Sequence, residues 1–273
     1  MRALVLLTGL AMLTVVGCGD DDDDNGMGPG ASSEFDVIQA GVDAYTDSDM
    51  APTISAQALW ENMNDGDASN DPVILSVRSE AHYAIGHIPG AINIPWREVA
   101  DPAQLTKLSK SDDIVVYCYT GHTGGVATAA LNAMGYTATN LKFGMVGWTK
   151  NEAVRVAKPF SETTDAHDYA IETTPNAGGN YALASPDYTT SEDVAEIVRS
   201  AAENYVADTN KPPTISAQAV FDNLNDGDSS NDPVVLSVRS AQHYAIGHIP
   251  GAINIPWREV AKVENLTDRK SGV

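Results

Sequence analysis

The feature that most constrains the fold of this chain is a long internal repeat. Residues Thr53 to Ala100 recur as Thr214 to Ala261, at a shift of 161 residues, and 40 of the 48 positions are identical. The substitutions are mild, as in the change from Ile74 to Val235. A period this long indicates a duplicated domain rather than the short unit of a solenoid. The chain is therefore expected to build the same folding unit twice.

The two copies continue differently beyond the repeat. The first runs on through the apolar segment Ile114 to Tyr117, a loop that begins at Cys118, and a helical pattern. The second matches the first only to about Asp112 and contains no cysteine. It lacks counterparts of the strand, the cysteine loop and everything after them. We therefore expect any chemistry of Cys118 to belong to the first copy alone.

Composition and helical patterns divide the chain into five parts. A helix-like segment that ends in tyrosine precedes each copy, at Phe35 to Tyr45 and at Val194 to Tyr205, so each duplicated unit is predicted to include it. The predicted parts are a signal peptide at 1–17, an acidic flexible tether at 18–33, copy one with its leading helix at 34–158, a linker at 159–191, and a helix with the truncated copy two at 192–273.

Cys118 lies where a buried strand passes into a helix through a loop of small residues. The loop runs Tyr119-Thr120-Gly121-His122-Thr123-Gly124, and a helical pattern follows to Met134. Backbone N–H groups and the positive end of the helix dipole at such a turn lower a thiol pKa and bind an anion. An alternative interpretation is a buried core cysteine, because free cysteine is among the most buried residue types. The glycines favour a reactive thiol.

The amino-terminal segment predicts export and lipidation. An apolar stretch from Ala3 to Val16 has the length of a signal-peptide core, and Val15-Val16-Gly17-Cys18 resembles a bacterial lipobox. Cys18 is then expected to carry the lipid and to anchor the chain at the periplasmic or exterior face of the cell envelope. Gly19 is not the aspartate of inner-membrane retention, which favours the outer membrane. The alternative is an ordinary signal peptide with an incidental cysteine.

The net charge argues against some partners, and the cysteine content favours a reactive thiol. The formal net charge of −21 and the isoelectric point near 4.4 argue against nucleic acid and anionic membrane surfaces as partners. With Cys18 acylated, Cys118 has no cysteine with which to form an intramolecular disulfide. An unpaired cysteine in an exported protein indicates a reactive thiol, because that compartment favours disulfides.

The pattern of copy one predicts an α/β fold. Short apolar segments at Val73 to Val77, Ala91 to Ile94, Ile114 to Tyr117 and Asn140 to Phe143 alternate with helical patterns. Such alternation indicates a parallel sheet flanked by helices, with ligands at the carboxyl ends of the strands. Cys118 is at such an end. We interpret Trp60, Trp96 and Trp148 as packing residues of this fold.

Several of these segments together resemble the rhodanese (thiosulfate sulfurtransferase) domain. The matching stretches are Leu75-Ser76-Val77-Arg78, Tyr83-Ala84-Ile85-Gly86-His87-Ile88-Pro89-Gly90-Ala91-Ile92-Asn93-Ile94-Pro95, Val116-Tyr117-Cys118-Tyr119-Thr120-Gly121, and Leu131 to Tyr136. The resemblance covers about residues 52–158 in full and 213–273 as an amino-terminal half. It implies a rhodanese-like parallel sheet, complete in copy one and half-length in copy two.

The resemblance also implies a chemistry. In this family the loop cysteine accepts a sulfane sulfur as a persulfide and passes it to a thiol or to cyanide. Carried over, Cys118 is the catalytic residue, and Tyr119, Thr120, Gly121, His122, Thr123, Gly124 and Arg78 are the candidate substrate-binding residues. The expected partners are a small sulfur donor and a thiol or cyanide acceptor. The chain is expected to need no cofactor.

The sequence departs from the family at positions near the cysteine loop, and these departures leave a non-catalytic function open. Ser76 stands where the family commonly has aspartate, and Thr123 where it often has a basic residue. His122 is then the only loop side chain that can be cationic, and Arg78 could equally serve as a structural clamp. The alternative function is a non-catalytic rhodanese-fold module that binds a partner or senses sulfur or redox state.

Two other classes fit the residues less well. Phosphatases that share this fold carry an arginine six positions after the cysteine, where this chain has Gly124. The repeated histidines, His82 and His87 in copy one and His243 and His248 in copy two, lack a third and fourth metal ligand, so we interpret them as structural.

The near-identity of the copies also predicts self-association by domain swapping, in which Thr214 to Ala261 replaces Thr53 to Ala100.

Overall fold

A computed structural model describes residues 32–267 of the chain. The predicted signal peptide, Cys18, and the tether as far as residue 31 lie outside this range, so the lipid anchor and the envelope location stay predictions. None of the helices within residues 32–267 is both long and apolar enough to span a bilayer.

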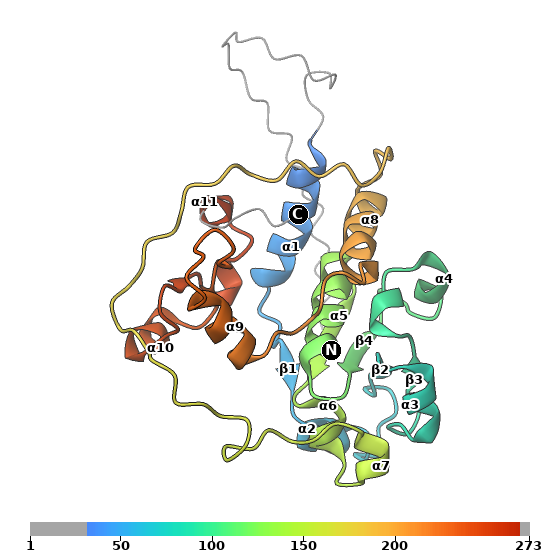
Figure 1. The fold of residues 1–273 in the computed structure, drawn as a ribbon. Helices are drawn as coiled ribbons and strands as arrows, with labels where there is room; N and C mark the ends of the chain where they lie inside the picture. Colours follow the sequence, from blue (N-terminus) through green and yellow to red (C-terminus); the bar gives the residue numbers. More distant parts are fainter. Residues whose placement is uncertain (1–31, 268–273) are drawn as a thin grey trace. The chain divides into compact units, whose positions relative to one another are not determined.

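Copy one contains a sheet of five parallel strands in the order β1-β5-β4-β2-β3 (Figure 1). The strands are β1 (Thr53–Ile54), β2 (Val73–Ser76), β3 (Ile92–Asn93), β4 (Asp113–Tyr117) and β5 (Thr137–Leu141). The central strand β4 is buried from Ile114 onward, and its Val116 pairs with Leu75 of β2 and Asn140 of β5. Near-continuous apolar strands suit a parallel sheet that is covered on both faces. The predicted α/β class is confirmed.

Alternate residues of β4 enter two different cores, as the two-residue period of a strand requires. Ile114 and Val116 pack with Leu131 of α5 (His122–Ala133) on one face. Val115 and Tyr117 pack with Leu59 of α2 (Ala56–Asn62) on the other face. Cys118 continues the first series and joins the core that includes α5.

Shorter helices connect the strands of copy one. They are α3 (Glu80–Ile85), η1 (Trp96–Glu98), α4 (Pro102–Leu105), α6 (Gly144–Trp148) and α7 (Glu152–Arg155). Ser79, Asp101 and Asn151 cap α3, α4 and α7, each by accepting a backbone N–H. Trp96 and Trp148 pack against the cores, whereas the prediction for Trp60 is wrong, because 54% of that residue is exposed on α2.

Copy two is shorter and its sheet is incomplete. It contains α9 (Ala217–Leu224), α10 (Ala241–Ile246), η2 (Trp257–Glu259) and α11 (Val263–Leu266). Strands β6 (Leu236–Ser237) and β7 (Ile253–Asn254) pair in parallel, with the register that β2 and β3 have in copy one. No further described strand joins them.

The two leading helices are α1 (Glu34–Thr46) and α8 (Val194–Ala207). Helix α8 packs on copy one, which it does not precede, whereas α1 packs both on α5 of copy one and on η2 of copy two. Val198 and Val206 of α8 are buried in the α5-side core of copy one. An ideal Cβ atom at Gly41 of α1 would lie 3.0 Å from the Ala133 carbonyl oxygen and 3.3 Å from Val198. The missing side chain at Gly41 therefore lets α1, α5 and α8 approach one another closely.

Equivalent arginines of the two copies bind the carboxyl ends of α8 and α1. Arg97 of η1 donates to the carbonyl oxygens of Val206 and Asp208, at the carboxyl end of α8. Arg258 of η2, its counterpart, donates to the carbonyl oxygens of Thr46 and Ser48 at the end of α1. The two helices are thus related by a shift of 160 residues, one fewer than the shift of the repeat.

A second pair of equivalent hydrogen bonds joins α1 to copy two and α8 to copy one. The Gln39 side chain of α1 donates to Ala261, and its counterpart Arg199 of α8 donates to Ala100. Since Ala100 and Ala261 are equivalent positions of the repeat, the two hydrogen bonds are equivalent. The two helices therefore link the copies: α8 lies on copy one, and α1 contacts both copies.

Candidate active site

Cys118 occupies the bend between β4 and α5, at the carboxyl end of the central strand. Its Sγ lies 3.0 Å from the Gly121 backbone nitrogen, which donates to it. Only 1% of the residue is exposed, because its side chain also belongs to the α5-side core. Cys118 is thus packed in the core, and its sulfur accepts from the Gly121 N–H at the start of a twelve-residue helix.

The loop carbonyls are held by the segment that follows β5. The Met145 and Val146 N–H groups donate to the carbonyl oxygens of Cys118 and Tyr119, at 2.9 and 3.0 Å. This close approach requires glycine at residue 144, where φ is +52° and an ideal Cβ would lie 2.6 Å from the Cys118 carbonyl oxygen. With those two carbonyls bound from behind, the loop can present N–H groups to the sulfur.

Asn140 supports the loop from the neighbouring strand β5. Its amide nitrogen donates to the Gly121 carbonyl at 3.0 Å. Its Oδ1 is buried without a hydrogen-bond partner in the described residues, and an ideal Cβ at Gly124 would lie 2.5 Å from it. Sequence reasoning did not single out Asn140. The signal available was a polar residue near the carboxyl end of a strand adjacent to the one that carries Cys118.

Tyr119 is tied to the start of α3. Its hydroxyl lies 2.6 Å from His82 Nδ1 and accepts from the Ser79 backbone N–H at 3.2 Å. The His82 and Tyr119 rings meet edge to face, with centroids 5.4 Å apart. His82 therefore anchors a loop side chain, a role that sequence reasoning did not anticipate.

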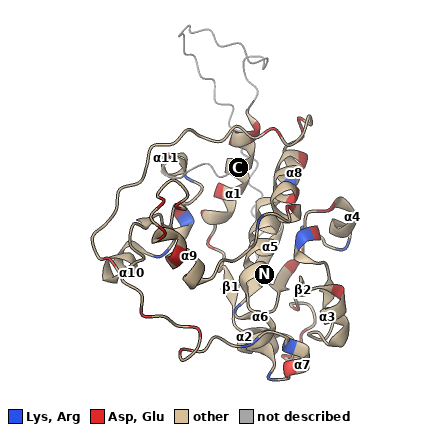
Figure 2. Cartoon of the chain, in the orientation of Figure 1, with Lys and Arg blue, Asp and Glu red and all other residues tan. Residues whose placement is uncertain are grey.

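The remaining loop residues form the outer rim. Thr120 Oγ1 and His122 Nδ1 lie 2.7 Å apart, and His122 is exposed. Thr123 is half-buried and Gly124 is buried at the first turn of α5. The loop contains no acidic residue, although acidic side chains are spread over the helices and loops of the molecule (Figure 2). His122 is thus placed to add positive charge at the rim when it is protonated.

Arg78 lies behind the loop and is fully buried. Its guanidinium donates to the carbonyl oxygens of Gly86 and Val154, at 2.5 and 3.0 Å. The same group stands 5.5 Å from the ring centroid of Tyr117 and 5.9 Å from that of Tyr119. Within residues 32–267 its hydrogen bonds go to these two carbonyls rather than to the cysteine loop. Arg78 therefore joins α3 to α7 and supports the Tyr119 ring.

The histidines of the repeat have packing roles. His87 stacks on Tyr83 with centroids 4.0 Å apart, and His248 stacks on Tyr244 with centroids 3.7 Å apart. Burial raises the pKa of the Tyr83 hydroxyl, which donates to the Ala91 carbonyl. Across residues 32–267, no three His, Cys, Asp or Glu side chains gather as metal ligands would.

Comparison with known proteins identifies the family. The chain matches the rhodanese-like domain family twice, over residues 55–151 and, in a shorter match, over residues 216–272. It therefore belongs to the rhodanese-like domain family, as the motifs around Gly86 and Cys118 indicate. Similarity to a rhodanese-like domain protein from Staphylococcus aureus has 25% identity and a TM-score of 0.34, over 37% of this chain and 94% of that one.

Three curated relatives are named as sulfurtransferases. A sulfurtransferase from Allochromatium vinosum is 28% identical over 37% of this chain and 92% of its own length. The thiosulfate:glutathione sulfurtransferase of Saccharomyces cerevisiae is 33% identical over 30% of this chain and 68% of its own length. The thiosulfate sulfurtransferase PspE of Escherichia coli is 40% identical over 23% of this chain and 61% of its own length. These similarities support a role in sulfur transfer in general terms.

Proposed function

We propose that copy one transfers sulfane sulfur through a persulfide on Cys118. The observation that carries the proposal is the 3.0 Å contact between Cys118 Sγ and the Gly121 N–H, at the start of α5. A backbone donor and a helix amino terminus both stabilise a thiolate and the persulfide anion that replaces it. The family of sulfurtransferases to which the chain is similar supports the same chemistry.

The proposed reaction has two displacement steps. The Cys118 thiolate attacks the outer sulfur of the donor, the new S–S bond forms, and the donor's sulfur bond breaks with its electron pair on the leaving group. The resulting persulfide anion is stabilised by loop N–H groups. A thiolate or cyanide acceptor then attacks the terminal sulfur and releases the Cys118 thiolate. No net oxidation of the protein occurs over the cycle.

The burial of Cys118 restricts the size and charge of the sulfur donor. Because only 1% of the residue is exposed, a donor must reach it with a slender terminal sulfur. Gly121 and Gly124 leave room beneath the loop for Asn140, which an added Cβ at Gly124 would approach to 2.5 Å. With Arg78 engaged by two carbonyls, the negative charge of a donor is met by backbone N–H groups and by His122 at the rim. This favours donors of small size and low charge.

The test is turnover by the mature protein. Thiosulfate or 3-mercaptopyruvate is supplied with cyanide, and thiocyanate is measured for the wild type and for Cys118→Ser. We expect thiocyanate from at least one donor and none above background from Cys118→Ser. Absence of turnover with every sulfane donor would count against the proposal.

A non-catalytic binding or sensing module is the second candidate. It is favoured by the absence of arginine and lysine from the loop and by the presence of a copy without a cysteine. The rate of Cys118 alkylation as a function of pH separates the two. A thiol pKa near the free value of about 8.5 would favour the module, and one well below 7 would favour the enzyme.

We also propose that Cys18 carries a lipid that attaches the protein to the cell envelope. The support is the sequence Val15-Val16-Gly17-Cys18 after an apolar stretch. Replacement of Cys18 by serine should move the protein from the membrane fraction to the soluble or secreted fraction. A Cys18→Ser protein that stayed with membranes would contradict the lipid anchor.

A further inference from the structure

Phe143 adopts a backbone conformation that a bulky residue rarely takes. It lies between β5 and α6 with φ at +65° and ψ at +5°, in the left-handed region that glycine enters without strain. At the next residue, Gly144, the close approach to the Cys118 carbonyl oxygen excludes a side chain. Residue 143 carries a large side chain in a similar conformation, so its backbone is strained where glycine would not be.

The Phe143 side chain contributes little to the folded core. The residue is 61% exposed, whereas Met145, two positions later, is 2% exposed and packs with Leu59 of α2. An aromatic side chain stabilises a fold mainly through the apolar area that it buries, so a mostly exposed ring offsets little of its own strain. Strained residues of this kind cluster at functional sites. The ring at residue 143 therefore has a role outside the core.

Phe143 lies against the cysteine loop. An ideal Cβ at Gly121 would be 3.3 Å from the Phe143 backbone nitrogen and 3.6 Å from its Cα. Gly121 is the residue whose N–H donates to Cys118 Sγ. The exposed ring therefore belongs to the rim of the loop, beside the backbone group that binds the sulfur.

The charges around Phe143 favour an anionic ligand. The Lys142 ammonium lies 5.4 Å from the centroid of the Phe143 ring, and Lys142 is exposed. No Asp or Glu occurs from Cys118 to Asn151, although the chain contains 37 of these residues. An exposed ring beside a cation, in a segment without acidic residues, suits a molecule that has both an apolar part and an anionic group.

The sulfur acceptor fits this position better than the donor does. A donor must reach Cys118 Sγ itself, which is buried. Once the persulfide has formed, its terminal sulfur lies one S–S bond, about 2 Å, beyond Sγ. An acceptor can therefore react with that sulfur while the rest of the molecule stays at the rim.

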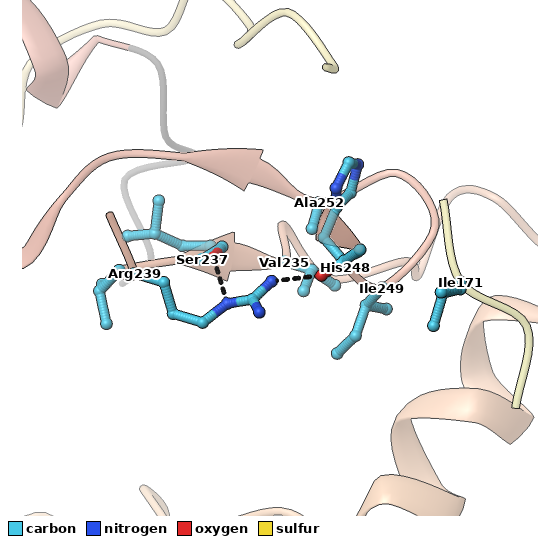
Figure 3. Close-up of a pocket in the computed structure, with 10 residues that line it drawn as sticks. Ile171, Val235, Ser237, Arg239, His248, Ile249 and Ala252 are labelled. Atoms are coloured by element: carbon cyan, nitrogen blue, oxygen red, sulfur yellow. Dashed lines mark hydrogen bonds between the residues drawn. The ribbon is translucent and has the colours of Figure 1, made fainter. Parts of the chain in front are cut away.

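A cavity in copy two is not a competing place for the acceptor. It has a volume of about 450 Å³ and is lined by residues that include Val235, Arg239 and Ile249 (Figure 3). None of the described residues that line it comes from the cysteine loop, and copy two contains no cysteine. The acceptor must bind where Cys118 carries the sulfur, at the loop whose rim includes Phe143.

We propose that Phe143 and Lys142 bind the sulfur acceptor, which is an organic thiol with an apolar chain and an anionic end. The inference rests on the proposed function of Cys118. The apolar chain lies on the Phe143 ring, and the anionic end faces the Lys142 ammonium. The acceptor thiolate attacks the terminal sulfur of the Cys118 persulfide, a new S–S bond forms, and the bond to Cys118 breaks with its electron pair on Sγ. The products are an organic persulfide and the Cys118 thiolate.

The test compares two acceptors in the mature protein loaded with sulfane sulfur. The thiol is 6-mercaptohexanoate, and the reference is cyanide, which is small enough to react without touching the rim. Phe143→Gly should raise KM for the thiol at least about tenfold with kcat unchanged, because the ring contributes binding that the ground state and the transition state share. The same variant should keep its kinetics with cyanide. Phe143→Tyr keeps a ring and should use the thiol as the wild type does.

Val156→Gly is the matched control. Val156 also has a positive φ, at +63°, and is 43% exposed, but it follows α7 rather than facing the cysteine loop. This variant should leave the kinetics with both acceptors unchanged. Lys142→Gln should weaken transfer to 6-mercaptohexanoate about threefold, as loss of an exposed ion pair does, and leave transfer to the neutral 6-mercaptohexanol unchanged.

The outcomes separate this inference from the proposed function. A KM for the thiol that Phe143→Gly does not change would overturn the inference while transfer to cyanide upholds the function. A wild type that uses cyanide but not 6-mercaptohexanoate would do the same. Equal losses with both acceptors in Phe143→Gly would also overturn it, because the ring would then act on the loop rather than on the acceptor. Transfer to neither acceptor by the wild type would contradict the proposed function and the inference together.

Discussion

The two copies show that position within a repeat does not determine the environment of a residue. Ile94 and its counterpart Ile255 are both buried, at 0% and 3% exposure. Ile88 and Ile249 are equally equivalent, yet one is 0% and the other 48% exposed. Ile94 and Ile255 stay buried in both copies, whereas Ile88 shares the core that Tyr117 of β4 completes. Burial is therefore decided by the segment that follows the repeat.

The helices α1 and α8 make the two copies depend on each other. Both leading helices contact copy one, and α1 also contacts copy two, so the segment before the truncated copy contributes to the complete one through α8. Copy two can thus serve the fold of copy one without a cysteine loop of its own.

The largest effect should come from removing α8. Deletion of residues 192–273 uncovers the core that Val198 and Val206 cover, whereas deletion of 212–273 keeps that helix. Burial of one such side chain contributes about 1.5–3 kcal/mol, so the longer deletion should lower the unfolding free energy of copy one by several kcal/mol more than the shorter deletion. Urea unfolding of both proteins measures this. Equal stabilities would mean that α8 does not support copy one.

A matched pair of substitutions compares the faces directly. Ile88→Ala should cost about 2–5 kcal/mol of unfolding free energy, because it leaves a cavity in a packed core. Ile249→Ala removes the same atoms from a half-exposed side chain and should cost less than about 1 kcal/mol. The comparison is made by urea unfolding under one set of conditions. Similar losses in both variants would contradict the difference in burial between the copies.

The cysteine loop should be sensitive to one methyl group. Gly144→Ala brings a Cβ to within 2.6 Å of the Cys118 carbonyl oxygen, so the loop must shift and its sulfur transfer should fall at least about tenfold. Gly66→Ala is the control, since φ there is +87° but nothing lies within 4 Å of the added carbon. That variant should lose about 1 kcal/mol of stability at most and keep its activity. Normal transfer by Gly144→Ala would show that loop placement is not limiting.

The smallest expected effect is the pH dependence of linker attachment at Glu172. Hydrogen bonds from the Asn176 side chain and the Gly251 backbone lower the pKa of Glu172. A lowered pKa stabilises linker attachment above the ordinary glutamate value of about 4.3, and this contribution is lost as pH falls through the lower folded value. Hydrogen exchange at residues 171–176 should therefore speed up at acidic pH, beyond its intrinsic pH dependence. Glu172→Gln should flatten that response, and an unchanged response would contradict it.

The sequence was sufficient to predict the alternation of strands and helices in copy one. Apolar runs such as Ile114 to Tyr117 are local signals, and β4 forms at that place with Cys118 directly after it. The shorter second match was visible as well, because the counterpart of β4 is absent from the residues after Ala261. These features depend on near neighbours in the chain.

Other features depend on contacts between distant segments and could not be predicted. The position of α8 on copy one depends on side chains more than 100 positions away, such as Arg97, which donates to the Val206 carbonyl oxygen in the last turn of α8. The support of the loop by Asn140 and His82 depends on which strands and helices become neighbours. Leu59 is buried and its neighbour Trp60 is 54% exposed, so the burial of Trp60 depends on which face of α2 meets the sheet.

The most direct test of the central claim is the mass of the mature protein after brief incubation with a sulfane donor. The account predicts that the protein gains the mass of one sulfur atom, that the gain maps to Cys118, and that it disappears when cyanide or a thiol acceptor is added. Cys118→Ser should gain nothing. A wild-type protein that gains no sulfur from any donor, or keeps it when an acceptor is present, would contradict the account.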